Sequence, residues 1–380
     1  MLMKRKIRMG MVGGGPGAFI GDVHRRAARL NGDIELVAGV FGTDVAKSRE
    51  CGKDLFLDPA RVYPNYQDMV AGELKLPADK RIDFVAVVTP NRMHYPISKA
   101  FLEGGFHVLC EKPISMSSKE AVDLKATLVK TGKLFALMHN YTGYPMVKQA
   151  RQMVADGALG TVRKINVEYS LGWLAAPNAG KQAAWRVTPS EAGISGCMAD
   201  IGTHAQNLIH YVTGLDIVSL NADLATFVPG RALDDDGSVM LRFNNGARGV
   251  IFASEVATGE ENNFVLKIYG DKAGLEWRQE SPENLIFRTN DAPMQVYRRN
   301  WAGVGPVAQK ASHLPAGHPE GFLEAFANIY RAFADAIIAS LNGVKNPGGD
   351  FPGIDDGISE MRFLEALVKS SADTSKWVTM

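Results

Sequence analysis

The segment Gly13-Gly-Gly-Pro-Gly-Ala18 decides how the first part of the chain folds. It directly follows an apolar run at residues 7–12 and begins a helical pattern at residues 18–30. The spacing fits G-x-G-x-x-A, in which the first glycine makes a tight turn and the second lets a diphosphate approach the backbone. The third small residue lets the helix pack on the strand, and the helix N-terminus attracts the phosphates. The segment therefore predicts a strand–turn–helix unit that binds a dinucleotide through Gly13, Gly15, Pro16, Gly17 and Ala18.

The surrounding sequence decides between a binding loop and a tight turn without a ligand, because the glycine spacing alone occurs in both. Further apolar runs at residues 34–40, 84–88, 107–109 and 134–138 alternate with helical patterns at residues 95–103 and 118–130. Strands that alternate with helices are typical of a parallel sheet covered on both faces. This context favours the binding loop.

From about residue 160 the pattern changes to strands that follow one another. Candidate strands lie at residues 162–170, 217–227, 237–243, 247–254, 263–270 and 274–278. Asn244-Asn-Gly246 between two of them is typical of a hairpin turn, which indicates an antiparallel sheet. Helical patterns lie at residues 198–212 and 321–341, and the aperiodic residues 290–319 are predicted to form a loop.

The two patterns together predict an α/β chain with two domains. Residues 1–140 are expected to form a dinucleotide-binding domain of Rossmann type with a doubly wound parallel sheet. Residues 141–380 are expected to form an α+β domain for substrate binding and oligomerisation, with an open, largely antiparallel sheet and C-terminal helices that can pack back on the first domain. The length of 380 residues suits this division, since single cores rarely grow beyond about 250–300 residues.

Composition and charge exclude several classes of function. The formal net charge is +1 and no basic block or acidic tail is present, so neither nucleic acid nor an anionic membrane is an expected partner. No apolar run reaches the roughly 18–20 residues of a membrane helix, and the glycines near the N-terminus argue against a signal peptide. The three cysteines are far apart, which predicts neither a disulfide framework nor a metal site and favours the cytoplasm.

The end of the second predicted strand bears on the choice of cofactor. In dinucleotide-binding domains an acid near this point holds the ribose hydroxyls. Phe41 occupies the simplest position for that acid, and Asp44 lies slightly later but within reach. Thr43, Lys47 and Arg49 could accept a 2′-phosphate instead, although Asp44 would repel it. The expected cofactor is therefore NAD(P), with a preference for NAD.

Two later motifs complete the pattern. Glu111-Lys112-Pro113 follows a predicted strand, and Gly196-Cys-Met-Ala-Asp200-Ile-Gly-Thr-His204 opens a predicted helix. With the glycine-rich segment, these motifs resemble the Gfo/Idh/MocA family of oxidoreductases over essentially the whole chain. The resemblance implies a Rossmann domain followed by a domain with an open antiparallel sheet, and substrates that are mostly sugars, polyols and glycosides.

The residues of these motifs suit the oxidation of an alcohol. Asp200 and His204 are four residues apart in a helical pattern and so share one face. A histidine can accept the hydroxyl proton near neutral pH, while Asp200 anchors the substrate and Lys112 holds the alcohol oxygen. Taken singly, Lys112 also fits a solvated surface, Asp200 a helix cap and His204 a core position. Their order and placement favour the catalytic assignment.

Other residues are weaker candidates for binding. The resemblance and the positions at strand ends suggest cofactor contacts from Thr89, Pro90, Asn91, His94, Glu111, Lys112, Asn140, Trp185 and Arg186. Substrate contacts are expected from Lys112, Tyr141, Asp200, His204 and His318. Most of these positions also fit capped turns or packed loops.

The expected function is that of an NAD(P)-dependent oxidoreductase that converts a ring secondary hydroxyl of a sugar, inositol or glycoside to a ketone. By analogy with the family, the hydroxyl at the 3-position of a pyranoside is the expected site of oxidation. One alternative is a glycosidase that oxidises its substrate transiently and eliminates the aglycone. The other is a regulator that senses NAD(P) without catalysis. An exposed face of the second sheet would be a large apolar patch, which predicts a homo-oligomer.

Overall fold

The computed structural model describes residues 5–177, 180–374 and 376–380. The chain divides into two units, residues 1–139 with 326–359 and residues 140–325 with 360–380. Among the described residues, no helix has the length and apolar character that spanning a membrane would require.

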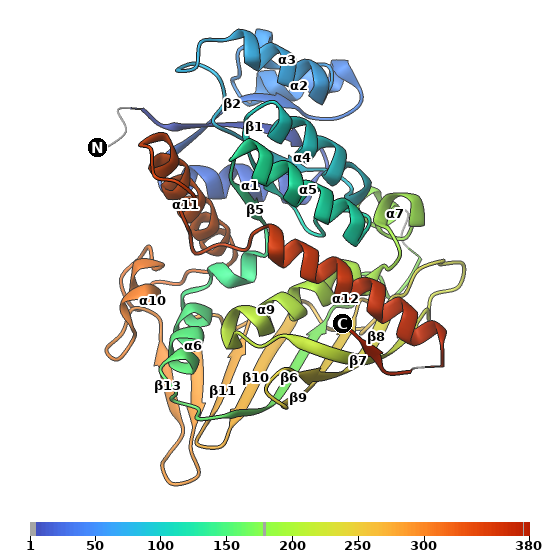
Figure 1. Cartoon of the computed structure of the whole chain (residues 1–380), viewed down its shortest axis with the longest axis vertical. Coiled ribbons are helices and arrows are strands. Elements are labelled where there is room, and N and C mark those ends of the chain that lie inside the picture. Colours follow the sequence, from blue (N-terminus) through green and yellow to red (C-terminus); the bar gives the residue numbers. More distant parts are fainter. Residues whose placement is uncertain (1–4, 178–179, 375) are drawn as a thin grey trace. The chain divides into compact units, whose positions relative to one another are not determined.

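The first unit is built on a parallel five-stranded sheet (Figure 1). Its strands are β1 (Ile7–Gly13), β2 (Ile34–Val40), β3 (Phe84–Val88), β4 (His107–Cys110) and β5 (Phe135–Leu137), in the order β2-β1-β3-β4-β5. All residues of β3 are buried, as expected for a strand covered on both faces. The strand order reverses between β1 and β3, and ligands of open α/β sheets bind at such a reversal. The predicted parallel sheet is confirmed.

Helices connect these strands. They are α1 (Phe19–Leu30), α2 (Val45–Asp54), α3 (Tyr66–Lys75), α4 (His94–Glu103) and α5 (Ser118–Thr131), with short 3₁₀ turns η1 (Pro59–Arg61) and η2 (Asn91–Met93). Helix α5 follows the predicted boundaries closely, because the Ser117 hydroxyl accepts a hydrogen bond from the Glu120 N–H and Gly132 ends the helix at a φ of +63°. Sequence patterns had not indicated α2 or α3.

A later helix completes the first unit. The long helix α11 (Phe322–Leu341) belongs to this unit from residue 326 onward. Its Tyr330 and Phe333 rings pack against Phe84 of β3, with ring centroids 6.3 Å and 5.5 Å away. Next to β5, the Leu137 N–H donates a hydrogen bond to the Pro352 carbonyl. The first unit is therefore assembled from two segments that are distant in sequence.

The second unit is built on a nine-stranded sheet. Its strands are β6 (Val162–Ser170), β7 (Ile217–Ala225), β8 (Asp236–Phe243), β9 (Arg248–Ser254), β10 (Asn263–Gly270), β11 (Gly274–Arg278), β12 (Asn284–Arg288), β13 (Gln295–Arg298) and β14 (Val378–Thr379). The order is β13-β12-β11-β10-β6-β9-β8-β7-β14. Neighbouring strands are antiparallel except β6 and β9, which are parallel, so the predicted largely antiparallel sheet is confirmed.

The predicted loop at residues 290–319 is partly wrong, because it contains β13 and the helix α10 (Pro306–Lys310). Strand β13 lies at the sheet edge and none of its residues is buried. An exposed edge strand needs no alternation of apolar and polar residues, so the sequence carried no signal for it.

Helices cover one face of this sheet, including α6 (Pro145–Ala155) and α9 (Thr203–Thr213) (Figure 1). The remaining short elements are η3 (Asn140–Gly143), α7 (Lys181–Arg186), α8 (Pro189–Ala192) and the π-helical turn η4 (Met198–Gly202), and α12 (Ile354–Ala372) follows later in the chain. In β8, Ser238, Met240 and Arg242 are exposed while the alternate residues are buried. The opposite face of the sheet is therefore open.

Candidate active site

The glycine-rich segment forms an open backbone turn between β1 and α1. Gly13 has a φ of +93°, and a Cβ atom there would collide with the carbonyl oxygen of Val88. A Cβ atom on Gly15 would collide with the carbonyl oxygen of Phe41. The segment therefore passes between the ends of two other strands, and only glycine fits at these positions.

The N-terminus of α1 suits an anionic group. Its N-cap is Ala18, which has no side-chain acceptor for the first N–H groups of the helix. Such N–H groups and the helix dipole together favour a phosphate. The predicted binding segment, Gly13 to Ala18, thus has the form that a dinucleotide diphosphate requires.

The candidate cofactor-binding residues that follow β2 lie near the start of α2. Phe41 is buried, and its N–H donates to the Ser48 hydroxyl over 2.9 Å. Thr43, Asp44 and Lys47 are exposed. Asp44 caps α2 by accepting from the Ala46 and Lys47 N–H groups, and the Lys47 bond is the main reason that the pKa of Asp44 is lowered. The Lys47 ammonium lies 3.7 Å from Asp44, and the negative charge of the Asp44 carboxylate disfavours a 2′-phosphate here.

The carboxyl ends of β3 and β4 meet around His94. Its Nδ1 lies 2.6 Å from the Pro113 carbonyl oxygen and its Nε2 lies 2.8 Å from that of Thr89. Thr89 also has a buried hydroxyl oxygen without a partner among the described residues, Asn91 is buried and Pro90 is partly buried. The structure thus brings the predicted group at residues 89–94 against the segment that carries Lys112.

Glu111 takes part in a buried network that sequence patterns had not indicated. His24 Nε2 lies 2.7 Å from Glu111 Oε1, and His24 Nδ1 lies 2.7 Å from the Tyr330 hydroxyl. The other Glu111 oxygen accepts the Lys112 N–H over 3.1 Å. Burial would raise the pKa of Glu111, but the His24 hydrogen bond and the positive charge of Lys112 lower it below its ordinary value. A buried histidine in α1 was the available signal, since its neighbours Gly21 and Ala28 share the same buried face.

In the second unit, His204 lies among aromatic rings. The Tyr141 ring meets the imidazole edge-on at a centroid distance of 4.9 Å, and the Tyr141 hydroxyl is hydrogen-bonded to that of Tyr169. Phe264 stacks on Tyr169 at 4.3 Å. Tyr141 is buried, and burial raises its pKa to about 12, so its hydroxyl stays protonated near neutral pH. Tyr141, predicted to contact substrate, forms part of the environment of His204.

Asp200 lies one turn before His204, on the π-helical turn η4, and it is paired with an arginine. The Arg186 Nε donates to Asp200 Oδ2 over 2.8 Å. The Arg186 guanidinium lies 4.3 Å from the Trp185 ring and 5.5 Å from the Trp173 ring. Arg186 and Trp185, both predicted to contact the cofactor, thus stand beside the predicted substrate anchor. No sequence motif indicates Trp173.

Asp234 holds the start of the segment that carries Asp200. Its carboxylate accepts the Gly196 and Met198 N–H groups over 2.9 Å each and the Ser195 hydroxyl over 3.0 Å. No sequence pattern indicates this role, because Asp234 follows Asp200 by 34 positions and belongs to a run of acids typical of a solvated turn.

The remaining predicted residues lie at separate places. Asn140 in η3 is buried, and its side-chain nitrogen has no partner among the described residues. An orphaned buried donor of this kind is compatible with a ligand acceptor. His318 is exposed, and its carbonyl accepts a hydrogen bond from Arg299.

Lys112 belongs to the first unit, whereas Asp200 and His204 belong to the second. Among the described residues, no group of His, Cys, Asp or Glu is placed to hold a metal ion.

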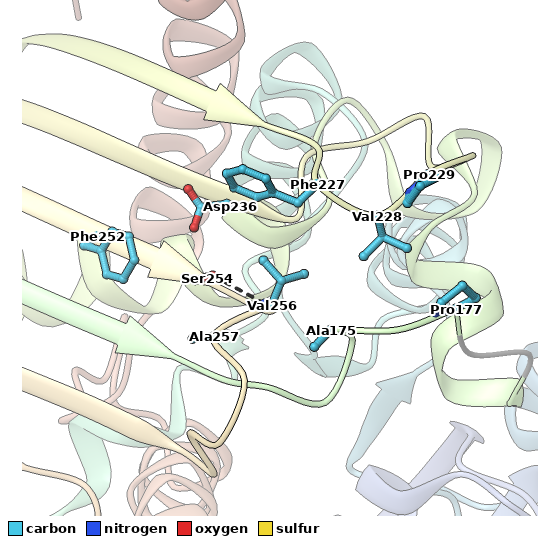
Figure 2. A pocket seen from close by; sticks show the side chains of 10 residues that line it. All are labelled: Ala175, Pro177, Phe227, Val228, Pro229, Asp236, Phe252, Ser254, Val256 and Ala257. Carbon is cyan, nitrogen blue, oxygen red and sulfur yellow. Dashed lines mark hydrogen bonds between the residues drawn. The ribbon is translucent and has the colours of Figure 1, made fainter.

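The second unit also has a pocket of about 480 Å³ that none of the predicted site residues lines. Figure 2 shows its mostly apolar lining, with Phe227, Phe252 and Val256 around the carboxylate of Asp236. Burial raises the pKa of Asp236. The pocket is therefore distinct from the group around Asp200 and His204.

Comparisons with known proteins agree with this geometry. Residues 7–139 match an oxidoreductase family with an NAD-binding Rossmann fold, and residues 147–276 match the GFO/IDH/MocA C-terminal domain. The uncharacterised oxidoreductase YfiI of Bacillus subtilis is 35% identical, with 99% of this chain and 98% of that protein covered. The levoglucosan dehydrogenase of Pseudarthrobacter phenanthrenivorans is 25% identical, with 98% of each chain covered.

A solved structure is also similar along the whole chain. The inositol dehydrogenase homologue of Azotobacter vinelandii, solved with NAD⁺, is 35% identical and covers 100% of this chain and 98% of its own, with a TM-score of 0.96. That homologue has also been solved with NADH and myo-inositol. The glycine-rich turn, the uncapped helix N-terminus and these matches agree on an NAD-binding dehydrogenase, and the chain belongs to the Gfo/Idh/MocA family of oxidoreductases.

Proposed function

We propose that this enzyme uses NAD⁺ to oxidise one secondary ring hydroxyl of a sugar, cyclitol or glycoside to a ketone. The observation that carries the proposal is the group formed by Asp200, Arg186 and His204 in the second unit. It combines an ion-paired acceptor for substrate hydroxyls with a histidine that can take a proton. Inositol and levoglucosan, named for the similar proteins, carry such hydroxyls on rings.

Each unit has its own part in this proposal. The first unit, with the segment Gly13 to Ala18, holds the cofactor, and the second holds the ring of the substrate. Bound NAD⁺ supplies the acceptor for the hydride that leaves the carbon atom. The domain division at residue 140 is part of the same proposal.

Three residues handle the substrate hydroxyls. His204 accepts the proton of the hydroxyl that is oxidised, because a neutral imidazole nitrogen is a suitable base near neutral pH. Lys112, in the first unit, supplies an ammonium group that can stabilise negative charge on an alcohol oxygen. Asp200, oriented by its ion pair with Arg186, accepts a hydrogen bond from a neighbouring hydroxyl.

Arg186 is assigned to the substrate rather than to the cofactor phosphates. Asp200 compensates its charge, and the guanidinium lies over two indole rings. A compensated arginine favours a neutral polyol over an anionic group. The partly exposed Trp173 ring adds an apolar surface against which a sugar ring can pack.

The test is a turnover assay with NAD⁺ and NADP⁺ on a panel of neutral ring polyols that includes myo-inositol, levoglucosan and methyl glucosides. We expect NADH formation and a keto product by mass spectrometry, with oxidation at position 3 for the pyranosides. Release of nitrophenol from nitrophenyl glycosides without net NADH would indicate the glycosidase instead. If no panel member is altered and NADH binds normally, the chain is a cofactor-binding regulator and the proposal fails.

We further propose that the open face of the second sheet is buried between copies of the chain. Met240, Phe252 and Tyr269 are exposed side chains of three different strands of this sheet, and the strand register places them on the same face. An apolar surface of this kind is rarely left in water by a monomer. A homo-oligomer would cover it.

A further inference from the structure

Two buried histidines contact the segment that carries Lys112, one on each side of it. His24 comes from α1 and His94 from α4, and their side chains are almost completely buried. His24 contacts the side chain of Glu111, whereas His94 contacts the carbonyl of Pro113. Lys112 is therefore flanked by two residues that different helices hold in place.

The contacts on the Glu111 side form one continuous chain of hydrogen bonds. An ionised carboxylate only accepts, so the His24 Nε2–H donates to Glu111 Oε1 over 2.7 Å. The other imidazole nitrogen of a neutral ring then accepts, and the Tyr330 hydroxyl donates to it over 2.7 Å. Glu111 Oε2 accepts the backbone N–H of Lys112. Each donor in this chain meets an acceptor when His24 is in a single neutral tautomer.

The chain joins three elements of the first unit that are far apart in sequence. Tyr330 lies on α11, His24 on α1 and Glu111 directly after β4. The rings of Phe326 and Tyr330 both meet the His24 ring edge-on, with centroids 5.2 Å and 5.8 Å away. A fully satisfied buried network of this kind rigidifies the backbone that it contacts.

We propose that His24, Glu111 and Tyr330 are positioning residues that fix the backbone of Lys112 and so aim its ammonium group, while His94 fixes the following residue. The proposal rests on the role in catalysis proposed above for Lys112. It also changes the expected role of Glu111 and His94 from cofactor contacts to supports of the reacting lysine. A lysine side chain has four rotatable bonds, so the direction of its base strongly affects where the ammonium group can lie.

The first test compares Glu111→Ala with Glu73→Ala, which is a closely matched control. Glu73 is also a buried glutamate of the first unit, and it also accepts a backbone N–H, that of Ile82, beside a tyrosine hydroxyl. Hydrogen–deuterium exchange measures the mobility of residues 107–117 without any substrate. We expect exchange there to accelerate at least about tenfold in Glu111→Ala and to stay unchanged in Glu73→Ala. Unchanged exchange in Glu111→Ala would overturn the proposal.

The second test separates positioning from cofactor binding. In Glu111→Ala we expect kcat, on the best substrate of the panel, to fall about 10- to 100-fold. The Kd of NADH, from its fluorescence, should stay within about threefold of that of the wild type. Glu111→Gln should restore most of the activity, because the amide can still accept from Lys112 while His24 changes tautomer. A Kd that rises in parallel with the loss of kcat would show that Glu111 contacts the cofactor and would overturn the proposal.

A second pair of variants, with milder substitutions, tests the proposal if Glu111→Ala does not fold. Tyr330→Phe removes one hydroxyl from the chain, and Tyr63→Phe removes a comparable hydroxyl from the Glu73 network. We expect faster exchange over residues 107–117 only in Tyr330→Phe. Equal exchange in both variants would contradict the proposal. Failure of the whole substrate panel would instead refute the proposed function, and the exchange measurement would still decide the role of the chain.

Discussion

Arg186 shows how much the role of one residue depends on its partners. In sequence, Trp185-Arg186 suggested a cofactor contact, but the guanidinium is paired with Asp200 and lies against two indole rings. A planar, stacked arginine keeps the carboxylate in one orientation in a way that a flexible lysine does not.

The substitution Arg186→Lys tests this assignment. We expect KM for the sugar to rise about tenfold, since a hydrogen bond to a charged group contributes roughly 1.5–3 kcal/mol. The Kd of NADH should be unchanged, as measured by fluorescence titration. Weaker NADH binding with an unchanged KM for the sugar would assign Arg186 to the cofactor.

The candidate site could be predicted from sequence only where a motif is local. Lys112 and the pair Asp200 and His204 lie in short motifs with recognisable spacing. The contact between His24 and Tyr330 joins residues 306 positions apart, and no pattern along the chain records such a distance. The same holds for Asp234, whose partners Gly196 and Met198 come from another segment.

At the scale of elements, the spacing of apolar residues predicted those helices and strands whose pattern depends on burial in the core. Strand β3 is apolar throughout because both of its faces are covered, and β8 alternates because one face is open. The helix predicted at residues 198–212 is present, but its first turn, η4, is π-helical. A pattern of buried residues does not distinguish a π-turn from an α-turn, and π-turns are frequent at functional sites.

The start of this helix depends on Asp234, which yields a prediction about stability. Asp234→Ala leaves the Gly196 and Met198 N–H groups without their acceptor, and each unsatisfied buried donor costs about 1–3 kcal/mol. We expect a clear loss of free energy of unfolding in urea, together with reduced turnover as the Asp200 turn loosens. Asp58→Ala is the control, because Asp58 caps the exposed turn η1. Equal losses in both variants would show that Asp234 has no special role.

At the scale of the whole molecule, the open sheet face makes a testable prediction about assembly. Met240→Glu places a charge on the exposed face of β8, where burial between copies would be unfavourable. Light scattering should show a smaller species than for the wild type. Val129→Glu, on the exposed surface of α5 in the first unit, should leave the mass unchanged. A monomeric wild-type protein would contradict the proposed oligomer.

The two units also account for the separate binding of cofactor and substrate in the proposed function. The turn suited to a diphosphate and the segment with Lys112 both lie at the carboxyl ends of parallel strands in the first unit, which is where open α/β sheets bind ligands. Asp200, Arg186 and His204 lie in the second unit, beside an antiparallel sheet. Cofactor binding and substrate binding should therefore respond to separate substitutions.

The most direct test of the proposed enzyme is to measure NADH binding and turnover side by side in Lys112→Ala. The control is Lys119→Ala, which removes an exposed lysine near the start of α5. If Lys112 stabilises the reacting oxygen, turnover in Lys112→Ala falls about 100- to 10,000-fold, while the Kd of NADH stays within a few-fold of that of the control. Turnover equal to that of the control would contradict the assignment of Lys112, and with it the proposed chemistry.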